Sequence, residues 1–225
     1  MTLTGSHAFG ELTAIEQRST AEMIADQLRN AILHGQFVAD KQLSEADLAA
    51  SFGVSRGPIR EALQRLMEEG LLHRARNRGV FVVAFDQADV RDIYTTRQAI
   101  ETAAAELILD GDIDGAIKLL TESCEQMDAA AEAGDAVAQT AADIEFHVRL
   151  VDASGSSRLR KIERTLLIES QISMTELDTR YVEPKASVAE HVAIVDALRA
   201  RDLPRVREAI HAHMHTAIRL LTEES

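Results

Sequence analysis

One aspartate and three histidines in the second half of the sequence have the types and the spacing of metal ligands. Asp143 and His147 are four residues apart in a stretch with apolar residues at helical spacing, which places their side chains about 40° apart on one face. His191 and His213 each lie among the apolar residues of a further helical stretch. Three imidazoles and one carboxylate suit a divalent transition metal, Zn²⁺ first and Ni²⁺, Fe²⁺ or Mn²⁺ as alternatives, and leave positions open for water or a ligand.

Other interpretations of these histidines stay open, because single histidines are common at surfaces and in hydrogen-bonded cores. His211 and His215 are assigned to that class, since residues two positions from His213 on a helix point to the opposite side. Four roles stay open for a metal at this site. It would anchor a ligand, act as the signal itself, have a structural role or take part in catalysis. Catalysis needs a general base or nucleophile beside the metal, and Glu190, next to His191, has the wrong helical phase.

A second group of residues has the chemistry of a helix that reads DNA. Residues 55–68 carry one apolar face, formed by Ile59, Ala62, Leu63, Leu66 and Met67. Gly57, Arg60 and Gln64 fall together on another side of the same helix, with Arg56 near its leading end. Arginine bonds guanine edges or phosphates, and a glycine lets the backbone approach the DNA closely. The helix therefore has one face for packing and one for a DNA groove.

Three helices are expected to hold this reading face in place. Ser19 or Thr20 begins a helix that runs to about His34, and Gly35 follows as a stop signal. Residues 44–52 form a second short helix behind a serine cap, and Ser55 is expected to cap the reading helix in the same way. Two short helices joined by a glycine-containing turn have the layout of a helix-turn-helix.

A basic hairpin is expected directly after the reading helix. Two β-prone runs, 71–75 and 80–83, flank the tip Arg76-Asn77-Arg78-Gly79, which is able to reach the DNA backbone or the minor groove. Residues 55–79 hold six arginines and three glutamates, a local charge of +3 within a chain of net charge −13. A basic patch on an acidic background is typical of a nucleic-acid-binding surface.

Composition limits the remaining possibilities for the 225-residue chain. Cys124 is the only cysteine, which excludes an intrachain disulfide and fits a reducing cytoplasm. The sequence has no apolar run of about 18 residues and no secretory signal, so no membrane partner is expected. Residues 86–225 carry nearly all of the net negative charge, and phosphates would repel them. The second half therefore has a task other than DNA binding.

An all-helical bundle of about six helices is expected after the hairpin. Apolar residues recur at helical spacing, glycine, proline and aspartate mark the breaks, and no β-type alternation follows Val83. The expected helices span residues 88–109, 113–133, 137–153, 157–181, 186–200 and 204–223. Bundles build metal and ligand sites from side chains on facing helices.

The first part of the sequence closely resembles the GntR family of bacterial transcription regulators. The resemblance covers nearly all of residues 19–83 and is strongest from Gly53 to Leu63 and from Asn77 to Val82. It implies that operator DNA is contacted by Arg56 and Arg60, with Asn77, Arg78 and Gly79 at the minor groove. Three departures concern the base preference: Ala39-Asp40-Lys41-Gln42 instead of a loop with Pro-Gly, Ala46 instead of an arginine, and Gly57 instead of threonine.

The second part resembles the FCD domain, the effector domain of the FadR-type subgroup of this family. The segments that carry the resemblance are Asp143 to His147, Glu190-His191 and His213-Met214, with a first-helix pattern formed by Tyr94, Arg97 and Glu101. It implies a metal held by Asp143, His147, His191 and His213, and a pocket for small organic acids whose carboxylate meets the metal. Arg97 is the candidate ligand-binding arginine, and the alternative is an ordinary ion pair with Glu101, four residues on.

The sequence thus predicts a mainly α protein with a winged helix-turn-helix followed by a helical bundle. The expected divisions are a flexible N-terminal arm (1–18), a DNA-binding domain (19–85) and an FCD-like domain for ligand, metal and dimerisation (86–225). We expect a cytoplasmic, homodimeric transcription regulator, a repressor rather than an enzyme, that binds double-stranded operator DNA under the control of a small carboxylate effector. A dimer is expected because one recognition helix reads too few base pairs for operator specificity.

Overall fold

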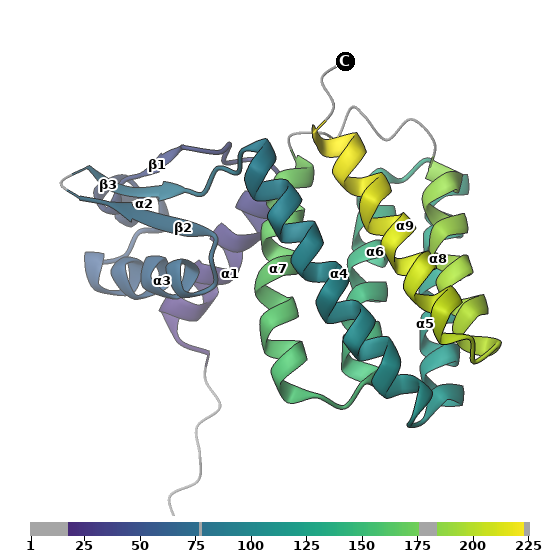
Figure 1. Cartoon of the computed structure of the whole chain (residues 1–225). Coiled ribbons are helices and arrows are strands. Elements are labelled where there is room, and N and C mark those ends of the chain that lie inside the picture. The colour runs from purple at the N-terminus through teal and green to yellow at the C-terminus, as the bar shows by residue number, and fades with distance from the viewer. Residues whose placement is uncertain (1–17, 77, 176–183, 223–225) are drawn as a thin grey trace, which may run out of the picture.

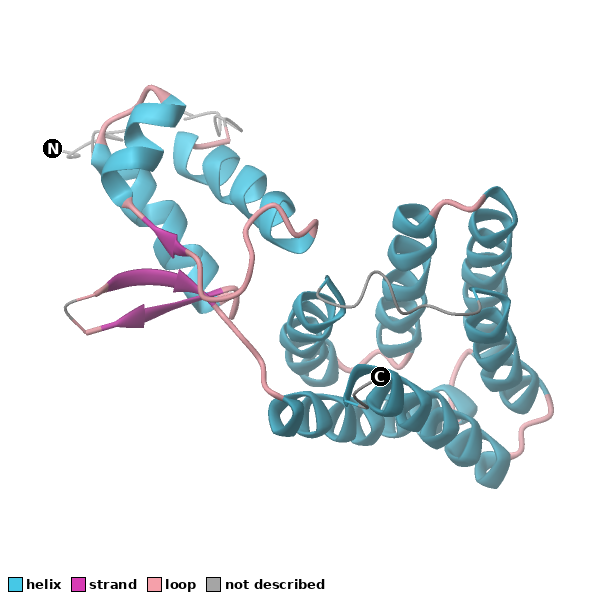
Figure 2. Ribbon diagram, turned by 90° about the horizontal axis from the view of Figure 1, so that it is seen from above, coloured by secondary structure: helices cyan, strands magenta, loops and turns pink. Residues whose placement is uncertain are grey.

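The computed structural model describes residues 18–76, 78–175 and 184–222. Its first part holds three helices and a small sheet, and its second part is a bundle of long helices (Figures 1 and 2). The predicted fold class is confirmed. No helix in the described ranges combines the length and the apolar character that crossing a membrane requires.

The first part is a winged helix-turn-helix built on its own apolar core. Its elements are α1 (Thr20–Leu33), β1 (Gln42–Leu43), α2 (Glu45–Phe52), α3 (Arg56–Glu68), β2 (Leu72–Ala75) and β3 (Gly79–Val82). The apolar face of α3 is fully buried at Ile59, Ala62, Leu63 and Leu66. The strands are antiparallel in the order β1-β3-β2, with Val80 of β3 opposite both Leu43 and Arg74. The core thus fixes which side of α3 faces outward.

The helix caps follow the sequence with one exception. Ser19 forms a reciprocal capping box with Glu22, and Ser44 accepts a hydrogen bond from the third residue of α2. The expectation that the Ser55 side chain caps α3 was wrong: it occupies the capping position but accepts no capping hydrogen bond in the described part of the chain. A capping side chain accepts from the second or third helical residue, and here the third is Pro58, which has no N–H.

The strand β1 was not foreseen, and it ties the loop before α2 to the wing. Gln42 lies opposite Phe81, and its side-chain amide donates a 2.6 Å hydrogen bond to the carbonyl oxygen of Arg78. Gly79, the next residue after Arg78, has a φ of 110°, a backbone conformation that residues with a Cβ rarely adopt. A Cβ at this position would lie 2.9 Å from the Gln42 amide nitrogen. The wing tip therefore depends on a glycine here.

We expect Gly79→Ala to lower the free energy of unfolding by about 1–3 kcal/mol, because alanine is strained at this φ and displaces the Gln42 side chain. Denaturant unfolding measures the effect. Gly57→Ala is the matched control, since its Cβ would meet nothing nearer than the Ser55 hydroxyl at 4.0 Å and Gly57 lies in a helix. Equal stabilities of the two variants would contradict the strain assigned to Gly79.

The second part is a bundle of α4 (Gln87–Leu109), α5 (Ile113–Ala133), α6 (Ala136–Ala153), α7 (Ser157–Thr175), α8 (Pro184–Arg199) and α9 (Leu203–Thr222). These bounds agree with the expected helices within two residues where the structure describes them; residues 176–181 of the expected 157–181 helix lie outside the described residues. A second core, with Phe146, Leu150 and Ile194 fully buried, fills the bundle. The helices therefore share one buried interior, and side chains from several of them meet there.

The helix α7 belongs to both parts of the molecule. Ile172 is buried in the core of the winged helix-turn-helix, and Ile168 packs against that core from the same helix. On another side of α7, Glu163 and Ser170 are buried against α4. Figure 1 shows α7 as the bundle helix beside α1, and the two helices are in contact. One helix thus connects the winged core to the bundle interior.

Candidate metal centre and nucleic-acid interface

The structure brings the four predicted metal ligands together from three helices. Asp143 and His147 come from α6, His191 from α8 and His213 from α9, and all four are buried. One ligand atom from each lies within 4.8 Å of those of the other three. These helices are far apart in the sequence, so packing of the bundle creates the cluster.

The spacing of the donor atoms fits one small cation. The Nε2 atom of His147 lies 3.2 Å from that of His213 and 3.4 Å from that of His191. The Nε2 atom of His191 also lies 3.2 Å from Oδ1 of Asp143. Donors around a tetrahedral Zn²⁺, at bond lengths of about 2.0–2.1 Å, are about 3.3 Å apart. The four residues therefore fit a bound divalent transition metal.

The other ring nitrogen of each histidine faces an oxygen atom that accepts a hydrogen bond. The three pairs are His147 Nδ1 with Glu101 Oε2 at 2.7 Å, His191 Nδ1 with the Ser187 carbonyl at 2.8 Å, and His213 Nδ1 with Glu190 Oε2 at 3.0 Å. Because a carbonyl or an ionised carboxylate only accepts, each Nδ1 carries the hydrogen and donates it. In the neutral ring, the Nε2 lone pair is then directed into the cluster. Three converging lone pairs repel one another unless a cation lies between them.

The electrostatics of the cluster also favour metal binding. Burial lowers the pKa of His147 to about 4, so its ring is neutral at pH 7. Burial opposes ionisation of Asp143, but the hydrogen bond and charge of His191 outweigh it and hold the pKa of this carboxyl below its usual range. The same contact raises the pKa of His191 despite its burial. Asp143 thus offers a negative charge to whichever cation, proton or metal, lies beside it.

Arg97 lies in the layer next to the cluster, where it is only 3 % exposed. Its guanidinium donates to Glu101 at 2.8 Å, to Glu163 at 3.3 Å and to the Ser170 hydroxyl at 3.3 Å. The expected pair with Glu101 is therefore present, but it is buried rather than exposed. Because Glu101 also accepts from His147, a continuous hydrogen-bonded chain joins Arg97 to a metal ligand.

Sequence reasoning missed the partners that orient the histidines. Glu101 was recognised as part of the first-helix pattern and as a neighbour of Arg97, but not as a partner of His147. Glu190 was set aside for its phase relative to His191, whereas it serves His213 on a different helix. The Ser187 carbonyl is a backbone atom and has no side-chain signal. His211 and His215 lie exposed on α9 and stack on each other with ring centroids 6.0 Å apart.

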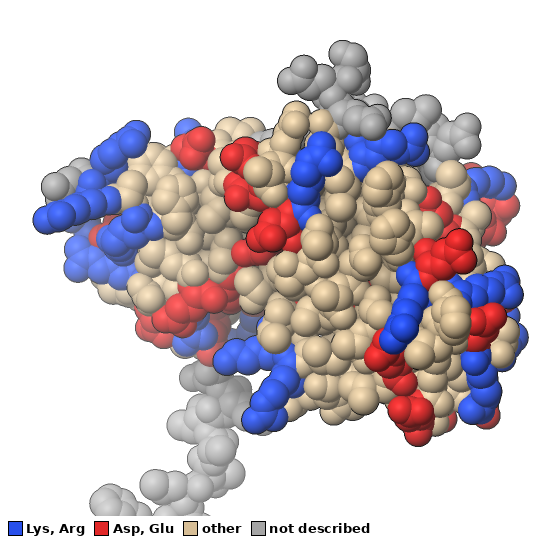
Figure 3. Space-filling view, in the orientation of Figure 1, with Lys and Arg blue, Asp and Glu red and all other residues tan. Residues whose placement is uncertain are grey.

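The predicted DNA-reading residues of α3 all lie at the surface: Arg56, Gly57, Arg60 and Gln64. Arg60 donates to Glu45 of α2 at 2.7 Å, and Gln64 donates to Glu68 at 3.0 Å. At the wing, Arg78 is exposed with its guanidinium 5.5 Å from the centre of the Phe81 ring. Asn77 lies outside the described residues. Figure 3 shows Lys and Arg side chains gathered at the end of the molecule that carries the hairpin and α3.

Comparisons with known proteins match both parts of the chain. Residues 20–82 match the model of bacterial regulatory proteins of the gntR family, and residues 92–216 match the model of the FCD domain. The chain is similar to the gluconate operon transcriptional repressor of Bacillus subtilis (strain 168), with 28% identity over 202 residues covering 88% of this chain and 83% of that protein. It is also similar to the HTH-type transcriptional repressor GlaR of Escherichia coli (strain K12), with 25% identity over 211 residues covering 87% and 93%.

A solved structure shares the whole arrangement. It is a GntR transcriptional regulator from Rhodococcus sp. RHA1, with a TM-score of 0.76 and 27% identity. The match covers 89% of this chain and 96% of that one. The similar proteins named here are transcriptional regulators rather than enzymes.

Proposed function

This chain belongs to the GntR family of bacterial regulatory proteins and carries an FCD domain, and from that premise we propose that it is a repressor controlled by a small organic acid. The winged part, residues 19–85, binds operator DNA. The helical part, residues 86–225, binds the metal and the acid and holds two copies together as a homodimer in the cytoplasm. The buried Asp143–His147–His191–His213 cluster, with a buried arginine beside it, is the observation that carries this proposal.

A Zn²⁺ ion is the metal that we propose first, with Ni²⁺, Fe²⁺ or Mn²⁺ as alternatives. Three imidazoles and one carboxylate suit these borderline ions. When bound, the metal supplies a Lewis-acidic positive charge that attracts a carboxylate. Arg97 is the second anchor in this proposal, because it is the guanidinium in the layer next to the cluster. One of the similar repressors is named for a gluconate operon, and gluconate is itself a hydroxy carboxylate.

The helix α7 is the part that we propose to transmit the signal. On one side Glu163 accepts a hydrogen bond from Arg97, and on another Ile172 is buried in the winged core. An acid that draws Arg97 towards itself alters this contact with α7. The two winged domains of the dimer then favour a different separation, which changes their fit to the operator half-sites.

Operator binding with and without metal, and with and without acid, tests the proposal. The purified chain is first analysed for metals, and thermal shift against a panel of small carboxylates identifies an acid that stabilises only the metal-loaded form. That acid is expected to change operator affinity. Operator affinity that responds to metal alone would make the metal the signal, and an affinity that responds to neither would leave the metal a structural role.

Arg60→Ala is expected to weaken operator binding by about 1–3 kcal/mol and to relax specificity at one base position. The guanidinium is exposed, and the 2.7 Å ion pair with Glu45 holds it in place on the outer face of α3. A gel-shift series over operator variants measures both effects. Arg205→Ala, an exposed arginine on α9, is the control and should leave binding unchanged. Unaltered binding by Arg60→Ala would remove this residue from the reading face.

A further inference from the structure

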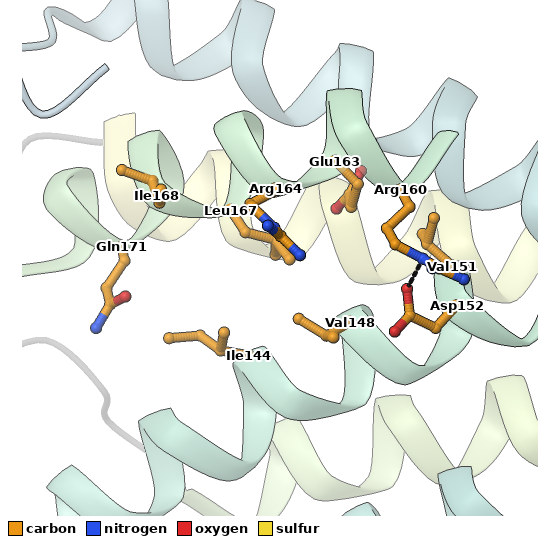
Figure 4. Close-up of a pocket in the computed structure, with 10 residues that line it drawn as sticks. All are labelled: Ile144, Val148, Val151, Asp152, Arg160, Glu163, Arg164, Leu167, Ile168 and Gln171. Atoms are coloured by element: carbon orange, nitrogen blue, oxygen red, sulfur yellow. Dashed lines mark ion pairs between the residues drawn. The ribbon is translucent and has the colours of Figure 1, made fainter. Parts of the chain in front are cut away.

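A cavity of about 150 Å³ lies between α6 and α7, beside the metal centre but not part of it. Two residues of its α6 lining, Ile144 and Val148, each follow a residue of the cluster, Asp143 and His147, by one position. One position is a rotation of about 100°, so each of these two side chains is turned away from the ligand that precedes it. Leu167 and Ile168 of α7 complete the apolar lining (Figure 4). A cavity of about this volume accommodates a benzene-sized molecule.

Glu163 supplies a buried polar group to this cavity. Its side chain is at most 2 % exposed, and its Oε1 atom accepts from Arg97 at 3.3 Å. Its Oε2 atom is buried and has no hydrogen-bond partner among the described residues. Burial and the nearby charge of Glu101 raise the pKa of Glu163 to about 8, against the opposing effect of Arg97. The group is therefore mostly a neutral carboxylic acid at pH 7, and a hydrogen bond with Glu101 contributes to the same shift.

Arg164 supplies a positive charge at the mouth of the cavity. Its side chain is exposed, extends towards the gap between α6 and α7 (Figure 4), and makes no hydrogen bond or ion pair with the part of the chain that the structure describes. Arg160, which also lines the cavity, is by contrast paired with Asp152 at 2.5 Å. One guanidinium is thus available to an occupant, and the other is neutralised.

We propose that this cavity is a second binding site, independent of the metal, for a small carboxylic acid with a compact apolar body. The apolar body lies against the aliphatic side chains, and the carboxylate pairs with the Arg164 guanidinium at the mouth of the cavity. A neutral Glu163 adds no negative charge to the lining that would repel the carboxylate of the ligand. A sugar or a phosphate would leave most of its polar groups unpaired against this lining.

An occupant of the cavity would also contact the winged part of the protein. Ile168 lines the cavity and packs against the winged core. Ile144 and Gln171, at one end of the cavity, also line a hollow against Leu33 and His34 at the end of α1. The second site therefore lies at the junction of the two parts. It extends the proposed function and does not depend on the metal-bound effector.

Calorimetric titration of the full-length, metal-loaded chain with benzoate tests this proposal. Val148→Phe fills the cavity and should weaken benzoate binding at least tenfold, as should Arg164→Ala, which removes the charge. The control Val38→Phe, at a valine that is 67% exposed and outside the cavity lining, should leave binding unchanged. Benzamide, which has the same ring but no charge, should bind at least tenfold more weakly than benzoate.

Two outcomes would overturn the second site. The first is benzoate affinity that Val148→Phe leaves unaltered. The second is binding that His191→Ala abolishes while Val148→Phe retains it, which would place benzoate at the metal centre and leave the proposed function intact. Loss of binding in Val148→Phe with an unchanged metal content would support the second site, even if the metal-bound acid of the proposed function were never found.

Discussion

His191→Ala is expected to lose most of its bound metal and to unfold at a lower temperature than the unaltered chain. His191 is fully buried, and its Nε2 atom lies 3.2 Å from Asp143 Oδ1 and 3.4 Å from His147 Nε2. The substitution removes a direct ligand, so the loss of affinity should exceed the 10–100-fold typical of a lost outer partner. A ligand at about 1,000 times its Kd stabilises the folded state by about 4 kcal/mol, and this contribution disappears with the metal. Elemental analysis and thermal unfolding measure the two effects.

His211→Ala provides the matched control for the metal centre. His211 lies on α9, like His213, but it is exposed and stacks on His215 instead of facing the cluster. Its replacement should leave both the metal content and the melting temperature unchanged. Full metal content in purified His191→Ala would contradict the ligand assignment, and equal metal loss in both variants would point to unfolding or to a general effect of purification.

The sequence predicts the two architectures well, because each signal is local. The apolar face of α3 and the breaks between the bundle helices are each determined by residues only a few positions apart in the sequence. Asp143 and His147 could likewise be placed on one face, since four residues on a helix fix their relation. Whether His191 and His213 meet them was not derivable from spacing, because the meeting depends on how three helices pack. The resemblance to the FCD domain supplied that step.

The features that sequence reasoning missed depend on contacts between distant segments. Glu190 was judged against its neighbour His191, whereas its partner is His213 on another helix. Ile168 and Ile172 have the spacing of ordinary bundle residues, and nothing local indicates that they pack against the winged core. The strand β1 is two residues long, too short for an alternating pattern to appear. The missing cap at Ser55, by contrast, is partly foreshadowed by Pro58, which lacks one of the two N–H groups that a capping side chain can bind.

The buried arginine gives the second large effect: Arg97→Ala is expected to lower the free energy of unfolding by about 3–5 kcal/mol. The guanidinium is 3 % exposed and is shared by Glu101 and Glu163. Its removal leaves a buried carboxylate without its cation and empties the space that the side chain filled. Arg207→Ala is the control, because Arg207 also pairs with a glutamate, Glu106 at 2.6 Å, but at the surface. That variant should lose at most about 1 kcal/mol. Denaturant unfolding compares the two.

A compensated variant separates the structural role of Arg97 from the proposed role in binding the acid. In Arg97→Met with Glu101→Gln, the charge and its partner are both removed, and the amide oxygen at position 101 still accepts from His147. Buried ion pairs are often replaced without loss of stability, so most of the lost stability should return. If Arg97 anchors the effector, this stable, metal-loaded variant should still fail to bind the acid that stabilises the unaltered chain. Acid binding of normal affinity in the compensated variant would leave Arg97 a purely structural residue.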